Sequence, residues 1–372
     1  MRTGSSVLHF GPAHPAAHGV LRCMLCMRGE WISSSILTLG LLHRGTEKLM
    51  ELRHVNTNIA YMDRMDYVSM LSNELVYTES VEGLVGLDVC YIHQLHRVML
   101  VEVTRMENHL LNIACHAGDL GCLLALLWLF EDREYLHEVL SSSSGARMHA
   151  SSIVPGGSRG VHALHWSKEV VQCMSTTGHR MDLLVHVLLL HRVWCCRLVG
   201  VGVSHDVVGH TMLSGVMLRC SGRAWDIRMM DTYGLLVPVG LQGDSMDRVV
   251  LRCVELLASV LLVVSTLHAI HLLTATSWTQ GHSTSLHGVL CLFMQWRWCA
   301  PSSSTSVHTV ESPKGELLIS MTVSTHRLWR CRVRPADLPH LLSLQALSVG
   351  TTLSDLVLLV GSVDVVFGSV DM

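Results

Sequence analysis

The chain has 372 residues, of which 49% are apolar and 15% are charged, and its formal net charge at pH 7 is −3. Soluble globular domains carry about 25% charged residues, so this composition predicts a chain that either enters a membrane or has much of its surface covered by other subunits. The small negative charge excludes the strongly basic surface by which proteins bind nucleic acid.

One apolar stretch, Leu256 to Leu273, has nearly the length of about 20 residues that a membrane-spanning helix needs. It also carries hydroxyl side chains and histidines, so we expect a buried helix, with a membrane span as the alternative. Two other apolar stretches are excluded as spans, because 183–203 is interrupted by histidines and arginines and 120–130 is too short. Burial by partner subunits is therefore the preferred explanation of the composition.

Short strands are predicted between Val7 and Leu42, where β-prone residues alternate and glycines separate the runs. Within this region, FGPAHPAAHGVLR (Phe10 to Arg22) places His14 and His18 four positions apart. Its prolines remove backbone donors and fix φ, which favours a tight turn leading into a strand. An imidazole held rigidly there could carry out proton chemistry near neutral pH. The alternative is a surface hairpin that happens to carry two histidines.

Cys23 and Cys26 form a CxxC pair inside a stretch that alternates as a strand would. No second CxxC is present to complete a four-thiolate metal site, so a strand is the preferred interpretation. The 13 cysteines are scattered along the chain, which favours free thiols in a reducing compartment over a disulfide framework.

From Thr46 to about Leu140 the apolar residues recur every three or four positions, which predicts helices. A polar cluster around His43 precedes the first of them. There Thr46 can cap the helix and Glu47 can lie in its first turn. Arg44 lies ahead of this cap, and a capped helix start does not explain it.

A helix is predicted over Met62 to Tyr77, with Asp63, Arg64, Asp66 and Tyr67 on its first turns. Asp63 and Tyr67 are four positions apart, so they could share a face or a hydrogen bond. A tyrosine flanked by methionine and leucine can also be an ordinary core residue.

A further helix is predicted over 98–111, and His116 and Asp119 follow it one turn apart among apolar residues. A buried Asp119 would need a partner, because an unpaired buried carboxylate is costly or has a raised pKa. A histidine elsewhere in the fold is a candidate for that partner. Arg147 and His149 lie in a short segment between two loops.

The remaining pattern predicts helices over 168–199 and 245–273, an irregular region over 274–310, a hairpin after Glu311 and a helix over 338–347. This order is typical of an α+β, mainly helical protein. We expect one compact unit with three parts: a strand-rich part over 1–45, a helical bundle core over 46–310 and a C-terminal α/β part over 311–372.

A series of motifs carries a family resemblance. They are, in chain order, FGPAHPAAHGVLR, GLLHRGTEKLME, DRMDYVSMLSNE, WLFEDRE, SGARMHA, SGVMLRCSG, VESPKGE and VDVVFGSVD. In this order they resemble the subunit 7 (49 kDa-type) family of NADH dehydrogenase, the hydrogenase-like quinone-site subunit of respiratory complex I. The resemblance runs from Phe10 to Asp371.

The resemblance implies the fold of nickel–iron hydrogenase large subunits, a helical bundle with small strand-rich N- and C-terminal parts. It implies that this chain ligates no metal and packs against a smaller subunit that holds the terminal [4Fe–4S] cluster. Ubiquinone would be reduced between the two subunits, within an NADH:ubiquinone reductase that translocates protons. Other implied partners are the 30 kDa-type subunit and the membrane-arm subunit of the quinone channel.

The implied location is the matrix side of the mitochondrial inner membrane, as a peripheral subunit. The first ten residues are few and weakly basic for a transit peptide, so we expect the gene to be mitochondrial, with a mature form of an imported chain as the alternative.

On the same basis, His18 and Tyr67 correspond to the residues that contact the quinone headgroup. Asp119 corresponds to the carboxylate that orients the histidine, and His14 is implied as a supporting residue of the turn. Quinone reduction takes two electrons and two protons, and an imidazole and a phenol can each donate a hydrogen bond to a developing oxyanion.

The resemblance also implies a basic group near the partner's cluster and a C-terminal hairpin that approaches the quinone. The basic group is Arg44, Arg64 and His149, and the hairpin is Asp364 to Gly368, including Val366. Positive charge near the cluster would raise its potential through space.

Some positions depart from the family pattern. Val154 stands where the family has arginine, Met372 stands where the family ends in arginine, and 274–310 and 319–330 match poorly. These departures bear on contacts with neighbouring subunits.

Two other functions remain to be weighed. A true hydrogenase needs two CxxC pairs near the ends of the bundle, and the corresponding stretches, 43–47 and 364–371, contain no cysteine. That reading is excluded. A non-catalytic, hydrogenase-like scaffold is the second alternative. The joint presence of His18, Tyr67 and Asp119 argues against it.

Overall fold

The computed structural model describes residues 5–13, 19–159, 164–189, 191–205, 212–230, 236–277, 303–324 and 327–372. His14 and His18 lie outside these ranges, and so does most of the segment expected to be irregular.

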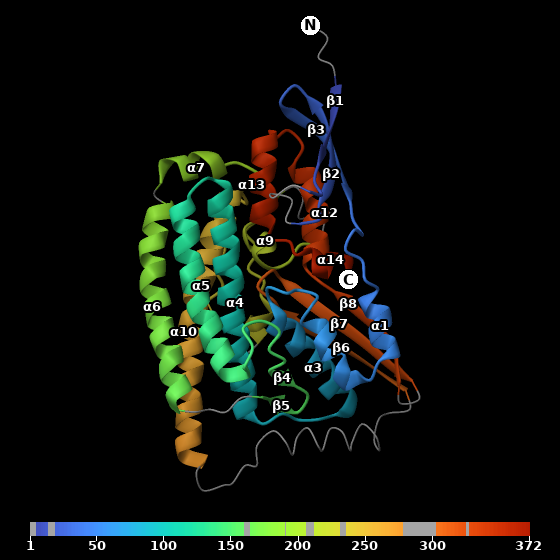
Figure 1. Ribbon diagram of the computed structural model, residues 1–372, viewed down its shortest axis with the longest axis vertical. Helices are drawn as coiled ribbons and strands as arrows, with labels where there is room; N and C mark the ends of the chain where they lie inside the picture. The colour runs from blue at the N-terminus through green and yellow to red at the C-terminus, as the bar shows by residue number, and fades with distance from the viewer. Residues whose placement is uncertain are drawn as a thin grey trace.

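Helices dominate the described chain, and three small sheets accompany them (Figure 1). The helical elements are α1 (Thr46–Leu52), η2 (Val55–Thr57), α2 (Ile59–Met62), α3 (Met70–Val85), α4 (Tyr91–Asp119), α5 (Leu123–Ser144), α6 (Leu164–Leu189), α7 (Arg192–Leu198), α9 (Gly215–Arg219), η3 (Ile227–Met230), α10 (Ser245–Ser277), α12 (Asp337–Leu347), α13 (Leu353–Val363) and α14 (Phe367–Asp371). The strands are β1 (Ser5–Phe10), β2 (Arg22–Arg28), β3 (Trp31–Thr38), β4 (Ile153–Val154), β5 (Gly157–Ser158), β6 (Ser303–Glu311), β7 (Glu316–Ser324) and β8 (Arg327–Arg334).

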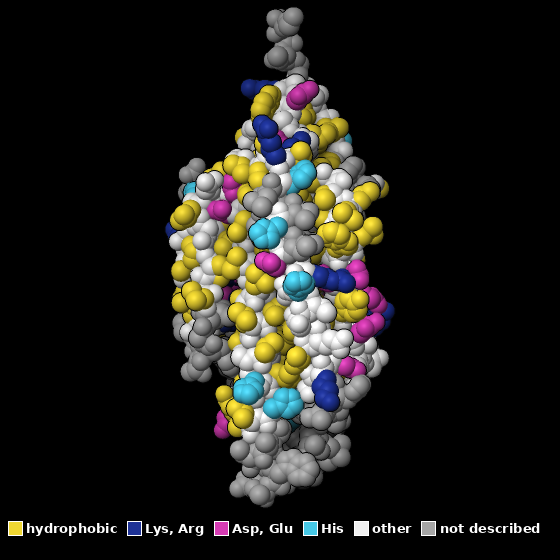
Figure 2. All heavy atoms as spheres, turned by 90° about the vertical axis from the view of Figure 1, so that its left-hand side faces the viewer, with side chains coloured by type: hydrophobic (Ala, Val, Ile, Leu, Met, Phe, Trp, Pro, Cys, Tyr) yellow, Lys and Arg dark blue, Asp and Glu magenta, His cyan; other side chains and the backbone are white. Residues whose placement is uncertain are grey.

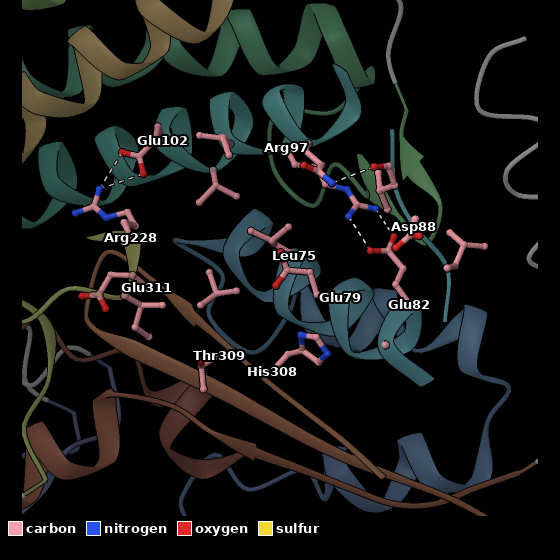
Figure 3. A pocket seen from close by; sticks show the side chains of 18 of the residues that line it. Leu75, Glu79, Glu82, Asp88, Arg97, Glu102, Arg228, His308, Thr309 and Glu311 are labelled. Carbon is pink, nitrogen blue, oxygen red and sulfur yellow. Dashed lines mark hydrogen bonds and ion pairs between the residues drawn. The ribbon is translucent and has the colours of Figure 1, made fainter. Parts of the chain in front are cut away.

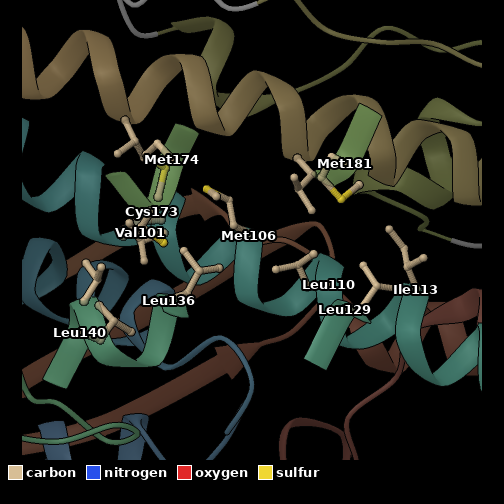
Figure 4. Packing of buried hydrophobic residues seen from close by; sticks show 14 of the residues in the cluster. Val101, Met106, Leu110, Ile113, Leu129, Leu136, Leu140, Cys173, Met174 and Met181 are labelled. Carbon is tan, nitrogen blue, oxygen red and sulfur yellow. The ribbon is translucent and has the colours of Figure 1, made fainter. Parts of the chain in front are cut away.

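The long helices α4, α5, α6 and α10 form a bundle, and α4 contacts α3, α5, α10 and α13. Apolar side chains at helical spacing on α4 meet those of α5 and α6 in the largest core (Figure 4). The labelled core residues are Val101, Met106, Leu110, Ile113, Leu129, Leu136, Leu140, Cys173, Met174 and Met181. Truncating one such leucine or methionine to alanine costs about 2–5 kcal/mol, so this core fixes the position of α4.

The bundle also buries charged groups, and ion pairs compensate them. Arg228 of η3 and Arg105 each bind Glu102 at 3.1 Å, and Glu255 of α10 binds Arg219 at 2.7 Å. Burial opposes the charge on Glu102, but the two arginines outweigh it and lower the pKa of Glu102 to about 2. Buried ion pairs of this kind hold helices in one register, because losing one partner leaves an uncompensated charge.

Antiparallel sheets lie at both ends of the chain. In the first, β2 pairs with β1 and β3, with Phe10 opposite Cys23. In the second, β7 pairs with β6 and β8, and alternate residues of β7 are buried. The second sheet packs on α1 and α3. The predicted strands, the hairpin after Glu311 and the α+β, mainly helical class are thus confirmed.

The prediction of an irregular region over 274–310 is wrong at both of its ends. Helix α10 continues to Ser277, and β6 begins at Ser303. The polar composition of β6 concealed it, because one of its faces is exposed to solvent. The division of the chain at 45/46 and 310/311 remains a proposal.

The predicted helix over 62–77 begins later than expected. Helix α2 ends at Met62 and α3 begins at Met70. The Asp66 carboxylate accepts hydrogen bonds from Val68 N at 3.2 Å and Ser69 N at 3.3 Å. A side chain that bonds its own backbone in this way competes with helix formation, so the segment between the helices is a turn.

The predicted cap of the first helix is also wrong. The N-cap of α1 is Gly45, with φ of 66°, and Thr46 is a buried first helical residue. Glycine adopts this left-handed conformation without steric cost, which lets the chain turn sharply after Arg44.

The C-terminal residues are bound to the segment ahead of α1. The Asp371 carboxylate accepts hydrogen bonds from Gly40 N at 2.9 Å and Leu42 N at 2.7 Å. The carbonyl of Met372 accepts from Arg44 N at 3.2 Å and Gly45 N at 3.1 Å. These bonds fix the position of Arg44 relative to α14.

Within the described ranges, Ser245–Leu273 of α10 is the segment long and apolar enough to cross a membrane, although 39% of its most apolar window is buried. Core helices pass the same test, and α10 packs on α4, α6 and α13. Its outward side chains include Leu257, Leu261 and Val264. Figure 2 shows the bundle side of the molecule, where apolar side chains are abundant and charged ones sparse.

We predict that Gly368→Ala destabilises the chain. A Cβ at this position would overlap the carbonyl oxygen of Met65, a backbone atom that cannot move aside cheaply. Overpacking of this kind costs about 1–3 kcal/mol. Denaturant unfolding measures the change, and Gly178→Ala, whose Cβ would lie 3.9 Å from Val260, is the matched control. Equal stabilities of the two variants would contradict the prediction.

Candidate functional site

Tyr67 lies in the turn between α2 and α3 and is 40% exposed. The sequence alternative that it is a core residue is therefore wrong. Its neighbour Asp66 is buried and organises the turn through the backbone hydrogen bonds described above. Burial of part of the ring, followed by the negative charge of Asp66, raises the pKa of Tyr67 above its ordinary value. The phenol therefore keeps its proton at neutral pH and can donate it.

A buried lysine holds this turn from behind. Lys314 lies in the four-residue turn between β6 and β7, and its Nζ donates to Asp66 Oδ2 and to Asn108 Oδ1 of α4, both at 2.7 Å. Asn108 Nδ2 in turn donates to Asp364 Oδ2 at 2.8 Å. Removing one partner of a buried ion pair costs about 3–5 kcal/mol, so the position of the Tyr67 turn is strongly determined.

The charges in this cluster compensate one another. Burial alone would lower the pKa of Lys314, but the carboxylates of Asp66, Asp364 and Asp337 together raise it. Burial alone would raise the pKa of Asp364, but Lys314 and Arg252 together lower it. Lys314 and Asp364 are therefore ionised across the physiological range.

The turn that carries Lys314 fits closely against the start of α9. Gly215 has φ of 61°, and a Cβ there would overlap the backbone of Lys314 and Gly315. Glu316 N donates to Ser214 Oγ at 3.0 Å. This close approach explains why the motifs SGVMLRCSG and VESPKGE, distant in sequence, belong to one structural unit.

The C-terminal segment passes beside the Tyr67 turn. Asp364 has φ of 59° and ends α13. Val366 N donates to Asp337 Oδ1 at 3.1 Å, and Gly368 packs against the backbone of Arg64 and Met65. The predicted C-terminal approach residues and the Tyr67 turn are thus brought together.

Arg44 and Arg64 also lie side by side. Arg44 Nη2 donates to the carbonyl of Arg64 at 2.8 Å, and Arg64 Nη1 donates to the carbonyl of Ala60 at 2.7 Å. Both side chains are exposed, and among the described residues their guanidinium groups bind backbone carbonyls, so carboxylates do not neutralise the two positive charges there. They form a basic patch at one edge of the Tyr67 turn.

His149 is joined to the same region through a buried acid pair. His149 and Ser151 have φ of 53° and 45°, a conformation that costs of order 1–3 kcal/mol and needs support from its surroundings. Ser151 Oγ donates to Asp63 Oδ2 at 3.2 Å, and Ile153 N donates to Glu74 Oε2 at 2.8 Å. Burial, and then the hydrogen-bonded Asp63, raise the pKa of Glu74 well above its ordinary value. Glu74 therefore holds its proton more tightly than an exposed glutamate, and it binds the backbone of this loop at Ile153.

Asp119 is the last residue of α4, and the structure corrects the expectation that it is buried, because it is exposed. Asp119 lies at the C-terminal end of α4, close to α13. Its Oδ2 would be 3.3 Å from a Cβ on Gly361, a residue of α13. His116 is the buried member of this pair, with its ring edge-on to Trp194. The implied contact of Asp119 with His18 involves a residue outside the described ranges.

A large cavity of about 580 Å³ lies elsewhere, between α3, α4 and β6 (Figure 3). None of the predicted site residues lines it. Its principal charges bind one another: Arg97 with Glu82 and Arg228 with Glu102. A large pocket is the default candidate for a ligand site, but charges already paired within the chain favour a structural role here.

Three important residues escaped the sequence prediction. Lys314 lies in VESPKGE, one of the motifs of the family resemblance, but no role was predicted for it. The rarity of lysine in this chain is the one feature of the sequence that could have pointed to it. Asn108 and Asp337 gave no local signal, because their contacts are with distant parts of the chain. Asn108 binds Lys314 across 206 residues, and Asp337 binds Val366 and Ser369 across 29 and 32 residues.

The helical bundle with small terminal sheets places the chain in the class of α+β, mainly helical proteins, as expected for a 49 kDa-type subunit. In the part of the chain that the structure describes, no three His, Cys, Asp or Glu side chains are grouped to hold a metal ion. Cys23 and Cys26 lie in β2, as the alternating pattern predicted.

Comparison with known proteins identifies the family. A family model described as respiratory-chain NADH dehydrogenase, 49 Kd subunit, matches residues 119–372. The chain is 37% identical to the NADH-ubiquinone oxidoreductase 49 kDa subunit of Prototheca wickerhamii, over 98% of this chain and 96% of the relative. It is 39% identical to NADH dehydrogenase (ubiquinone) iron-sulfur protein 2 of Arabidopsis thaliana, over 98% and 97%. The chain belongs to the 49 kDa subunit family and is a core subunit of respiratory complex I.

We predict a pH-dependent contribution from Glu74 to stability. Its pKa in the folded chain lies above the ordinary value of 4.5, so the folded state binds its proton more tightly than the unfolded state. The free energy of unfolding should therefore fall as the pH rises from 4.5 through the raised pKa, by about 1.4 kcal/mol per pKa unit of difference.

Glu74→Gln should remove this part of the pH dependence, because the amide cannot ionise and can still donate to Asp63. Denaturant unfolding at several pH values measures it. Glu134→Gln, a half-exposed carboxylate paired with Arg147, is the control. Identical pH dependence in both variants would show that the pKa of Glu74 is not raised in the folded chain.

Proposed function

We propose that this chain forms the ubiquinone-reduction site of complex I, next to the terminal [4Fe–4S] cluster of a smaller partner subunit. The observation that carries the proposal is the exposed phenol of Tyr67, on a turn that the buried Lys314–Asp66 ion pair fixes beside the C-terminal segment. A rigid, protonated donor at the surface, with no role in the core, fits a catalytic group better than a structural one.

The proposed chemistry divides the two protons of quinone reduction between two donors. The Tyr67 O–H donates to one carbonyl oxygen of the ubiquinone headgroup, and the imidazole of His18 donates to the other. Asp119, exposed at the end of α4, accepts a hydrogen bond from His18 and fixes its orientation, as carboxylates do behind catalytic histidines. His14 supports the turn that carries His18.

The basic residues act on the electron donor. Arg44 and Arg64 present two exposed positive charges that carboxylates of the described chain do not neutralise, and His149 lies in the neighbouring loop. Positive charge beside the partner's cluster favours its reduced form and raises its potential without ligation. Asp364 and Val366 line the approach of the quinone from the C-terminal side.

The other parts of the proposal concern the assembly. The remaining partners are the 30 kDa-type subunit and the membrane-arm quinone-channel subunit, and quinone reduction drives proton translocation. The low charge of the chain and the apolar outer face of α10 fit a subunit covered by neighbours. The proposed location is peripheral, on the matrix side of the mitochondrial inner membrane.

The alternative function is a non-catalytic hydrogenase-like scaffold. A scaffold has no need for an exposed phenol held by a buried ion pair, or for an unneutralised pair of arginines beside it. The groups that compensate the buried charge of Lys314 also fix the positions of Tyr67 and of the C-terminal segment, and this favours a catalytic site.

We predict that Tyr67→Phe lowers quinone-dependent NADH oxidation by the assembled complex about 100-fold, because it removes one proton donor. NADH–ferricyanide activity should not change, since those electrons leave before the quinone site. Tyr91→Phe, an exposed tyrosine at the start of α4, is the control and should be silent. Unchanged quinone turnover in Tyr67→Phe would remove Tyr67 from the site.

For His18→Ala we expect loss of quinone reduction without loss of assembly, because the residue is proposed to act on the quinone and not on the fold. A native gel stained for NADH oxidation follows assembly, and quinone turnover follows function. A complex that fails to assemble would instead assign His18 a structural role.

A further inference from the structure

Another, smaller cavity adjoins the Tyr67 turn, because Met65 and Asp66 line it. Its volume is about 10 Å³, and its polar lining is Asp66, Asn73, Ser312, Asp337 and Ser369. A cavity of about 10–15 Å³ holds one water molecule when two or more polar groups can bind it. The cavity therefore offers a site through which one water can bridge the carboxylates of Asp66 and Asp337.

Asp337, at the start of α12, is 2% exposed and lies between this cavity and the C-terminal segment. Its Oδ1 accepts from Val366 N at 3.1 Å, and its Oδ2 accepts from Ser369 Oγ at 2.5 Å. Both donors come from residues that flank or belong to α14. A change in the charge of Asp337 therefore alters its hydrogen bonds to Val366 and Ser369, in the segment proposed to approach the quinone.

The charged groups that face Asp337 come from three segments. Lys314 stabilises its ionised form, whereas burial, which is the largest effect, and Asp66 disfavour it; the pKa of Asp337 is raised to about 7. Ionised Asp337 in turn raises the pKa of Tyr67, and Asp364 shares Lys314.

Among the described residues, the aspartates of the other elements packed on α12 are bound elsewhere. In α13, Asp355 caps its own helix, and in α14, Asp371 binds the backbone at residues 40 and 42. Strand β3 carries no ionisable side chain.

We propose that Asp337 is a positioning residue that takes up one proton when Tyr67 gives its proton to the quinone, so that an ionised Asp337 and a tyrosinate at Tyr67 do not coexist. This inference rests on the proposed function. The O–H bond of Tyr67 breaks and one quinone O–H bond forms, with electrons from the partner's cluster. The proton that binds Asp337 comes from solvent by way of the small cavity, and it leaves when Tyr67 is reprotonated.

The physical reason is mutual repulsion of charges in a poorly solvated place. Tyrosinate at Tyr67, beside Asp66 and Asp337, would raise the proton affinity of Asp337, and a neutral Asp337 would lower the cost of forming the tyrosinate. Lys314 binds Asp66 and, together with Arg252, stabilises the ionised form of Asp364. The positive charge of Lys314 does not outweigh the burial of Asp337, whose pKa stays raised, so a tyrosinate at Tyr67 beside an ionised Asp337 would not be compensated.

The test is the pH profile of quinone-dependent turnover in the assembled complex. In the unaltered complex, turnover should fall as the pH rises through about 7, because ionised Asp337 makes proton donation by Tyr67 harder. Asp337→Asn keeps the contacts to Val366 and Ser369 but cannot ionise. It should keep the activity at acid pH and lose this fall. Asp182→Asn, an exposed aspartate on α6, should keep the original profile.

Three comparisons make the outcome decisive. In a Tyr67→Phe background, Asp337→Asn should change nothing further, since its effect passes through the phenol. If Asp337→Asn does not assemble, Asp337→Glu, which keeps a carboxyl, should retain a fall with a shifted midpoint. An unaltered profile in Asp337→Asn, an equal loss at every pH, or an unmoved midpoint in Asp337→Glu would overturn the inference.

The same variants separate this inference from the proposed function. If Tyr67→Phe lowers turnover while Asp337→Asn keeps the profile, the proposed function stands and the inference fails. Unchanged turnover in Tyr67→Phe refutes the proposed function itself.

Discussion

The ammonium group of Lys314 is the constraint on which the rest of the site depends. It is buried, so its charge must be compensated, and the compensating groups come from the α2–α3 turn, from α4 and from the end of α13. Each of these segments is placed by its own packing: α4 by the bundle core, the β6–β7 turn by α9, and the C-terminal segment by the region ahead of α1. Because Lys314 binds groups from three rigidly packed segments, it gives the exposed Tyr67 a defined position.

Much of the fold could be predicted from the sequence. Alternation gave the strands β2 and β7, and the three-to-four spacing gave α4 and α10, because those elements each bury one face or stripe. The errors fall where a local polar interaction overrides periodicity. Asp66 binds backbone amides, so α3 begins later than its periodicity predicts. Gly45 is the N-cap of α1 in place of the expected Thr46. Strand β6 is polar, and its strand conformation becomes evident only from its pairing with β7.

The site was predictable to a lesser extent. Arg44, Arg64, Tyr67 and Asp364 belong to motifs that the family resemblance identified, and the structure brings them into one region. Lys314, Asn108 and Asp337 could not be assigned, because a residue that acts by contacts between distant segments leaves no mark on the residues next to it. The exposure of Asp119 was likewise beyond a pattern that places it on an apolar helix, since it depends on where that helix ends.

The bonds between the C-terminal residues and the segment ahead of α1 have a consequence for how the molecule is made. The ring of His43 binds the carbonyl of Asp371 across 328 residues of chain, and contacts of such sequence separation form late because the whole intervening chain must first be ordered. Arg44 is positioned by the same bonds, so its guanidinium reaches its final place at the end of folding. The basic patch is therefore complete only after the segment ahead of α1 and the C-terminal residues have come together.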